Sequence, residues 1–143
     1  MKVISVVNRK GGVAKTSTVQ MIASCLKAKG KKVLMFDLDS QGNLSMFNNA
    51  FDQEDNQIGN LLTGKKSKIV HGMLPCNYSL ADLEVENSIS VDRLKKFFIN
   101  STSLKQNYDF VVIDTSPSFG NFERGIFYAT NEIVAVLQLD EFG

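Results

Sequence analysis

The feature that most constrains this chain is a glycine-rich turn enclosed by two lysines, Lys10-Gly11-Gly12-Val13-Ala14-Lys15-Thr16-Ser17. The apolar run Val3 to Val7 before it predicts a buried strand. Apolar residues recur at helical spacing over 18–29 after it, which predicts a helix. In such a strand–turn–helix, consecutive backbone N–H groups and the positive end of the helix face the same point. We therefore expect residues 10–17 to form a phosphate-binding loop.

The loop departs from the strict pattern G-x-x-x-x-G-K-[ST], because Arg9 and Ala14 occupy its two glycine positions. The alternative is an ordinary glycine turn flanked by solvated lysines. Two lysines that bracket Gly-Gly favour the phosphate loop. In that loop Lys15 would reach the β- and γ-phosphates of a nucleotide, and the Thr16 hydroxyl would take a coordination position of Mg²⁺.

Two further segments place acidic residues directly after predicted strands. The strand 33–36 leads into Asp37-Leu38-Asp39-Ser40-Gln41-Gly42-Asn43, and the strand 110–113 ends at Asp114. In open α/β sheets ligands bind beyond the carboxyl ends of the strands. Each segment by itself is also compatible with a polar turn. If these acidic residues do form a ligand site, Asp114 would hold a water molecule bound to Mg²⁺.

The remaining pattern predicts an α/β protein with a mainly parallel sheet, a three-layer sandwich of the P-loop NTPase type. We expect helices over 58–62, 91–104 and 121–130, strands over 78–83 and 133–137, and a loop over 115–120 that moves with the nucleotide. The strand 133–137 is of the buried type, and the chain stops soon after it at Gly143. We therefore expect a C-terminally truncated fold with an uncovered sheet edge and exposed apolar surface.

Composition adds few constraints. The 143 residues favour one domain spanning 1–143, and a net charge of +1 provides no general attraction to nucleic acid or membranes. The absence of a signal peptide and of a long apolar run predicts a cytoplasmic protein that does not bind membranes. Two cysteines form no disulfide framework, and we expect Cys25 in the core. Lys65, Lys66 and Lys68 are expected to form a solvated basic cluster rather than a nucleic-acid contact.

Together the three segments resemble the deviant Walker ATPases, and within them the ParA/Soj family of DNA-partition ATPases. Residues 10–16 are similar to that family's K-G-G-x-G-K-[ST] loop, residues 37–43 to its D-x-D-P-Q-x-N motif, and residues 110–117 to its Walker B strand. The resemblance covers most of this chain but only about the N-terminal half of a usual member. Ala14 and Ser40 depart from the first two patterns, and Gly125 and Val136 replace an asparagine and a proline that are usual later in the fold.

The resemblance implies an ATPase that uses Mg²⁺ and acts in plasmid or chromosome segregation. It implies nucleotide contacts from Lys10, Gly11, Gly12, Val13, Ala14, Lys15, Thr16 and Ser17, catalytic roles for Lys10, Lys15 and Asp39, and metal-site roles for Thr16, Asp37 and Asp114. Lys10 would cross an ATP-dependent homodimer to the partner's phosphates, and Asp39 would position the attacking water. The implied partners are a centromere-binding, ParB-like adaptor and nonspecific DNA, the latter through regions outside this chain, with the protein at the nucleoid.

Of three alternatives, two remain open. A MinD-like cell-division ATPase is disfavoured by Gln41-Gly42-Asn43 and by the lack of a C-terminal amphipathic helix. A nitrogenase iron protein would need cysteines beyond Cys76, and the sequence has none, so this alternative is excluded. The third alternative is a truncated or non-hydrolysing module that holds nucleotide or only dimerises. We expect Ala14 to weaken ATP binding or hydrolysis if its position requires a positive φ.

Overall fold

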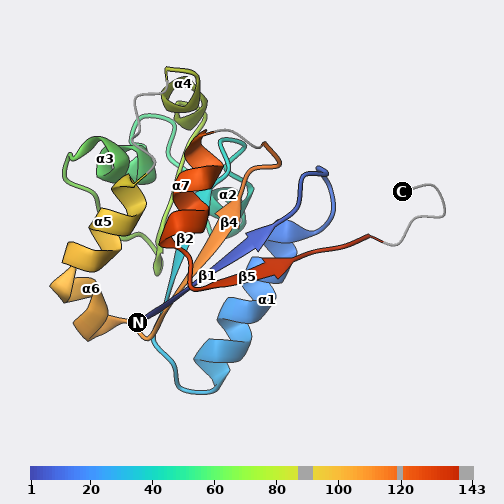
Figure 1. The fold of residues 1–143 in the computed structure, drawn as a ribbon, viewed down its shortest axis with the longest axis vertical. Helices are drawn as coiled ribbons and strands as arrows, with labels where there is room; N and C mark the ends of the chain where they lie inside the picture. The colour runs from blue at the N-terminus through green and yellow to red at the C-terminus, as the bar shows by residue number, and fades with distance from the viewer. Residues whose placement is uncertain (87–91, 119–120, 139–143) are drawn as a thin grey trace.

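The computed structural model describes residues 1–86, 92–118 and 121–138 (Figure 1). In chain order the elements are β1 (Lys2–Val7), α1 (Lys15–Ala28), β2 (Val33–Leu38), α2 (Asn43–Phe47), α3 (Gln57–Thr63), β3 (Met73–Leu74), α4 (Leu80–Val85), α5 (Arg93–Asn100), α6 (Thr102–Asn107), β4 (Phe110–Thr115), α7 (Asn121–Ala129) and β5 (Glu132–Ala135).

The strands form one parallel sheet in the order β3-β2-β4-β1-β5. The predicted parallel sheet is therefore confirmed. Strands β1 and β2, which α1 connects, are not neighbours, because β4 inserts between them. This insertion brings the acidic ends of β2 and β4 together, since Asp37 and Asp114 are paired in register.

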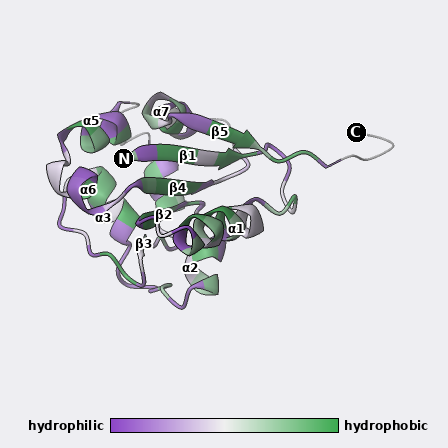
Figure 2. Ribbon diagram, turned by 90° about the horizontal axis from the view of Figure 1, so that it is seen from below, coloured by the Kyte–Doolittle hydropathy of each residue, from purple (hydrophilic) through white to green (hydrophobic). Residues whose placement is uncertain are grey.

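Helices cover both faces of the sheet, so the predicted three-layer sandwich is confirmed (Figure 2). Successive side chains along β2 point to opposite faces of the sheet and so contribute to the core on both faces. Leu34 and Phe36 pack in the cluster that contains residues of α3, α4, α5 and α7. Val33 and Met35 pack in the opposite cluster with residues of α1 and α2. All six residues of β2 are buried, as expected for a central parallel strand.

Several local predictions were wrong. Residues 78–83 were predicted as a strand, but the segment turns at Asn77, whose Oδ1 accepts hydrogen bonds from the Ser79 N–H (3.0 Å) and hydroxyl (2.7 Å). Helix α4 begins immediately afterwards and buries Leu80. The short strand β3 was not predicted. Cys25, expected in the core, is exposed because it lies on the outer face of α1.

The predicted helix 91–104 is divided into α5 and α6 by Ser101, whose ψ of 77° is not helical. Val91 lies outside the described residues. Strand β5 was predicted as a buried type over 133–137, but it ends at Ala135 and Ile133 is 54% exposed. In the described part of the chain β5 pairs only with β1, which agrees with the expected uncovered edge. Residues 119–120 and 139–143 of the predicted loop and C-terminal end are likewise outside the described residues.

Within the described ranges, no helix combines the length and the apolar character needed to cross a bilayer.

Candidate functional site

The phosphate loop connects β1 to the first turn of α1. Gly12 and Ala14 have φ angles of 74° and 63°, so the chain alternates in handedness and turns successive N–H groups inward. Ala14 stands at the N-cap of α1, and among the described residues no side chain caps this helix end. The first-turn N–H groups of α1 are therefore left to bind an anion.

This loop lines a cavity of about 550 Å³ at the carboxyl edge of the sheet. The lining residues are Gly11, Gly12, Val13, Ala14, Lys15, Thr16, Ser17, Asp39, Gln41, Asn43 and Pro117. A Cβ added to Gly11 or Gly12 would meet nothing within 4 Å in the described structure, so the loop's surface is open to a ligand. The cavity joins the first two sequence motifs to the loop after β4.

Thr16 links the phosphate loop to the end of β4. Its hydroxyl donates a 2.6 Å hydrogen bond to Oδ2 of Asp114. The other carboxylate oxygen, Oδ1, is buried and has no hydrogen-bond partner in the part of the chain that the structure describes. Burial raises the pKa of Asp114 to about 7, against the opposing effects of the Thr16 hydrogen bond and the Lys15 charge. A hydroxyl beside a carboxylate with an unused oxygen is a donor set that fits Mg²⁺.

Asp37 is held in a different network. It is fully buried, and its Oδ2 accepts hydrogen bonds from the Ser45 backbone N–H (2.8 Å) and hydroxyl (2.6 Å). Burial raises the pKa of Asp37 to about 6, although the Ser45 hydrogen bonds oppose the change. Asp37 thus fixes the start of α2 as well as lying next to Asp114.

Asp39 lies on the cavity wall, 8% exposed. Its Oδ1 accepts a hydrogen bond from the Gln41 N–H (3.0 Å), and its carbonyl oxygen accepts one from the Cys76 thiol (2.9 Å). Burial raises the pKa of Cys76, so the thiol remains a donor. Cys76, in the turn after β3, therefore holds the backbone of Asp39 while the Asp39 side chain lines the cavity.

The structure brings most of the predicted site residues together, with three exceptions. The described lining of the cavity does not include Lys10, Asp37 or Asp114. Asp114 is hydrogen-bonded to Thr16, which does line the cavity. Lys10 is exposed at the start of the loop. Sequence analysis assigned no role to Ser45 or Cys76, and it placed Pro117 only within the loop expected to move with the nucleotide. No spacing rule identifies Ser45 or Cys76, because they reach the site from α2 and from the turn after β3.

The family model described as an AAA domain (AAA_31) matches residues 1–143. The chain belongs to this family. It is a relative of the ParA/Soj P-loop ATPases, as the resemblance predicted. The sporulation initiation inhibitor protein Soj of Bacillus subtilis is 29% identical over 99% of this chain and 60% of its own length. The chromosome-partitioning ATPase Soj of Treponema pallidum is 33% identical over 99% of this chain and 58% of its own length.

Solved structures agree on the fold of this family member. Cobyrinic acid a,c-diamide synthase from Mycobacterium smegmatis, crystallised with an ATP analog and magnesium, superposes with a TM-score of 0.84 at 29% identity over 100% of this chain and 62% of that one. A putative plasmid partition protein from Borrelia burgdorferi bound to AMPPNP gives 0.83 at 21% identity, over 99% and 64% respectively. The chain thus spans about 60% of the length of the relatives it matches.

The strained position of Ala14 generates a first prediction. We expect Ala14→Gly to raise the free energy of unfolding by about 1 kcal/mol in urea denaturation without nucleotide, because a left-handed conformation costs an L-residue roughly 1–2 kcal/mol and glycine's greater unfolded freedom offsets part of the gain. Ala23→Gly, in the middle of α1, is the contrasting control and should lower stability by about 1–2 kcal/mol, because it loses helix propensity and a buried methyl group. A loss of stability in Ala14→Gly would contradict the assigned strain.

The buried carboxyls generate a second prediction, for the protein without nucleotide or Mg²⁺. Burial raises the pKa of Asp37 to about 6 and those of Asp114 and Glu84 to about 7. Between their ordinary values near 4 and these raised values, the folded state binds more protons than the unfolded chain. The contribution of these groups to stability should therefore fall as the pH rises from 4 to 7 and level off near pH 8.

The measurement is the urea midpoint at pH 5 and pH 8. Asp114→Asn should flatten the decline and stabilise the protein at pH 8 by on the order of 2 kcal/mol, since one pKa unit corresponds to about 1.4 kcal/mol. The exposed Asp82→Asn should leave the decline unchanged. An identical decline in Asp114→Asn and the wild type would show that Asp114 does not titrate as described.

Proposed function

We propose that this chain binds and hydrolyses ATP with Mg²⁺, as the nucleotide-binding part of a partition ATPase. The observation that carries the proposal is that, among the described residues, the N-terminus of α1 beside Thr16 has no side-chain cap and Oδ1 of Asp114 has no hydrogen-bond partner. One ligand with phosphate oxygens and a divalent cation would satisfy both. The relatives' names support the finer assignment, because two of them are Soj proteins and one solved relative was crystallised with an ATP analog and magnesium.

Each residue then has a separate role in binding. The N–H groups of residues 11–17 hold the phosphates, and Lys15, only 7% exposed, supplies a positive charge in a poorly solvated position. Thr16 gives its hydroxyl to Mg²⁺, with Asp114 and Asp37 supporting the metal shell. The hydrogen bond that Thr16 now donates to Asp114 keeps its oxygen lone pairs available. Bound Mg²⁺ would neutralise charge on the phosphate oxygens.

Hydrolysis needs an aligned water, and Asp39 is the carboxylate on the cavity wall suited to hold it. Water attacks the γ-phosphorus, the bond to the bridging oxygen breaks, and ADP and phosphate leave with the released proton. Lys15 stabilises charge that develops on the bridging oxygen. Phosphoryl transfer of this kind depends mainly on positioning and charge, which these residues provide.

The partition role adds a dimer and partners. Lys10, exposed at the start of the loop, would reach the phosphates bound by a second subunit, so ATP favours a homodimer and hydrolysis releases it. A partition role would also require a ParB-like adaptor and nonspecific DNA, the latter bound by regions outside this chain. It would place the protein in the cytoplasm at the nucleoid. The cargo is a plasmid or a chromosome.

The test is ATP turnover with Mg²⁺ by the wild type, Lys15→Ala and Ala14→Gly. We expect slow turnover in the wild type, a loss of at least about 100-fold in Lys15→Ala because its charge acts on the transition state, and faster turnover or tighter binding in Ala14→Gly. Lys31→Ala, an exposed lysine after α1, is the control and should match the wild type.

Two other outcomes would contradict parts of the proposal. Saturable binding without turnover in wild type and Ala14→Gly would support the non-hydrolysing module instead. Equal affinity and turnover in Ala14→Gly and the wild type would show that the methyl group of Ala14 does not impair the loop.

A further inference from the structure

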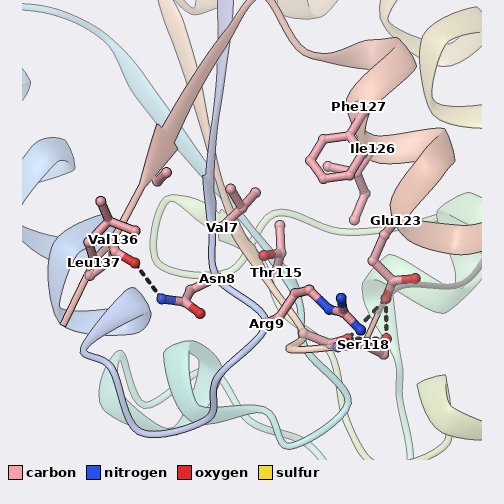
Figure 3. A pocket seen from close by; sticks show the side chains of 12 residues that line it. Val7, Asn8, Arg9, Thr115, Ser118, Glu123, Ile126, Phe127, Val136 and Leu137 are labelled. Atoms are coloured by element: carbon pink, nitrogen blue, oxygen red, sulfur yellow. Dashed lines mark hydrogen bonds between the residues drawn. The ribbon is translucent and has the colours of Figure 1, made fainter. Parts of the chain in front are cut away.

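A second cavity, of about 330 Å³, lies on the other side of the loop after β4, between the ends of β1 and β5 and helix α7 (Figure 3). Most of its wall is apolar, with Val7, Ile126 and Val136 among the lining residues. One end is polar and contains Glu123 of α7. The partition role proposed above gives this buried acid no function.

Glu123 is 4% exposed and holds the loop after β4. Its Oε1 accepts hydrogen bonds from the hydroxyls of Ser116 (3.0 Å) and Ser118. The two hydroxyls are also 2.6 Å apart, and the Ser118 N–H donates to the Ser116 oxygen. These contacts enclose Pro117, which lines the 550 Å³ cavity with the phosphate loop. A single carboxylate oxygen on α7 therefore holds the residues on both sides of Pro117, the described residue of the loop after β4 that lines that cavity.

Two charged groups connect Glu123 with the phosphate site. Figure 3 shows the guanidinium of Arg9 extending toward Ser118 and Glu123. Arg9 directly precedes Lys10, so the phosphate loop begins beside this carboxylate. The second group is Glu84 on α4. Burial is the main cause that raises the pKa of Glu84 to about 7, and the nearby negative charges of Glu123 and Asp39 raise it further. The phosphate loop, the Pro117 loop and α7 thus meet at one buried side chain.

We propose that Glu123 is a positioning residue that couples the phosphate site to helix α7 through the hydroxyls of Ser116 and Ser118. The inference rests on the proposed function, because it needs a nucleotide in the 550 Å³ cavity. When phosphate contacts order residues 10–17 and Pro117, the hydrogen bonds to Glu123 carry that ordering to α7. Without the carboxylate, the two hydroxyls lose a shared acceptor and α7 no longer responds to the nucleotide.

The experiment is hydrogen–deuterium exchange of backbone amides in the full protein, with and without Mg²⁺ and a non-hydrolysable ATP analog. The variants are Glu123→Ala and Glu123→Gln, the second keeping an acceptor oxygen and the packing volume. Arg124→Ala, exposed on the same helix, is the matched control. Thermal unfolding of each variant verifies that it is folded before exchange is measured.

In the wild type and Arg124→Ala we expect the analog to slow exchange both in residues 10–17 and in α7, by on the order of tenfold, within the usual range of coupling between sites. In Glu123→Ala the slowing should persist in residues 10–17 and be lost in α7, with Glu123→Gln between the two. A residue that only stabilises the fold would change exchange in α7 equally with and without the analog.

Two results would overturn the inference, and they are distinguishable. If the analog protects α7 equally in the wild type and both Glu123 variants, the coupling through Glu123 is wrong while the proposed function stands. If the analog protects no part of residues 10–17 in the folded wild type, nucleotide binding itself is wrong, and the coupling fails with it.

Discussion

The candidate site depends on polar groups at the carboxyl edge of the parallel sheet that lack hydrogen-bond partners in the described part of the chain. Among the described residues, the N-terminus of α1 has no side-chain cap, and a buried oxygen of Asp114 has no partner. Unpaired buried groups are costly, so a fold retains them where a ligand completes them. The strand order makes this possible, because β4 between β1 and β2 places Asp114 next to both the phosphate loop and Asp37.

The same arrangement explains why the site is built from three segments of the chain. β1 delivers the phosphate loop, β2 delivers Asp37 and Asp39, and β4 delivers Asp114 and the loop with Pro117. The hydrogen bond that Thr16 donates to Asp114 links the phosphate loop to the end of β4. Ala14 is the weak member, because its left-handed φ of 63° would suit glycine better. The rest of the loop geometry is present despite this local backbone strain.

Much of this could be predicted from sequence where a local pattern determines the structure. The run of Val3 to Val7, the Gly-Gly turn and the helical spacing after it predicted β1, the loop and α1, and strand–helix alternation predicted the parallel sheet. Prediction failed where distant contacts decide. Tyr78 to Leu83 was predicted as a strand after the Pro75 turn, yet the hydrogen bonds of Asn77 and the burial of Leu80 make it a turn and a helix.

The supporting residues of the site were beyond the reach of sequence patterns for the same reason. Ser45 binds Asp37 across eight positions, and Cys76 reaches Asp39 across 37. Glu123 is a common helical residue whose burial against Ser116 and Ser118 depends on how α7 packs on the sheet. Such contacts follow from the tertiary fold, so the motifs identify candidate residues of the site but not the residues that hold them in place.

The central claim is that one ligand, ATP with Mg²⁺, completes both the uncapped helix end and Asp114. Calorimetric titration of ATP into the wild type and Asp114→Asn, in Mg²⁺ and in EDTA, tests it most directly. We expect one site per chain, bound at least about tenfold more tightly with Mg²⁺ because the cation satisfies the carboxylate oxygen, and a markedly smaller Mg²⁺ effect in Asp114→Asn. Equal affinity with Mg²⁺ and EDTA in the wild type would contradict it.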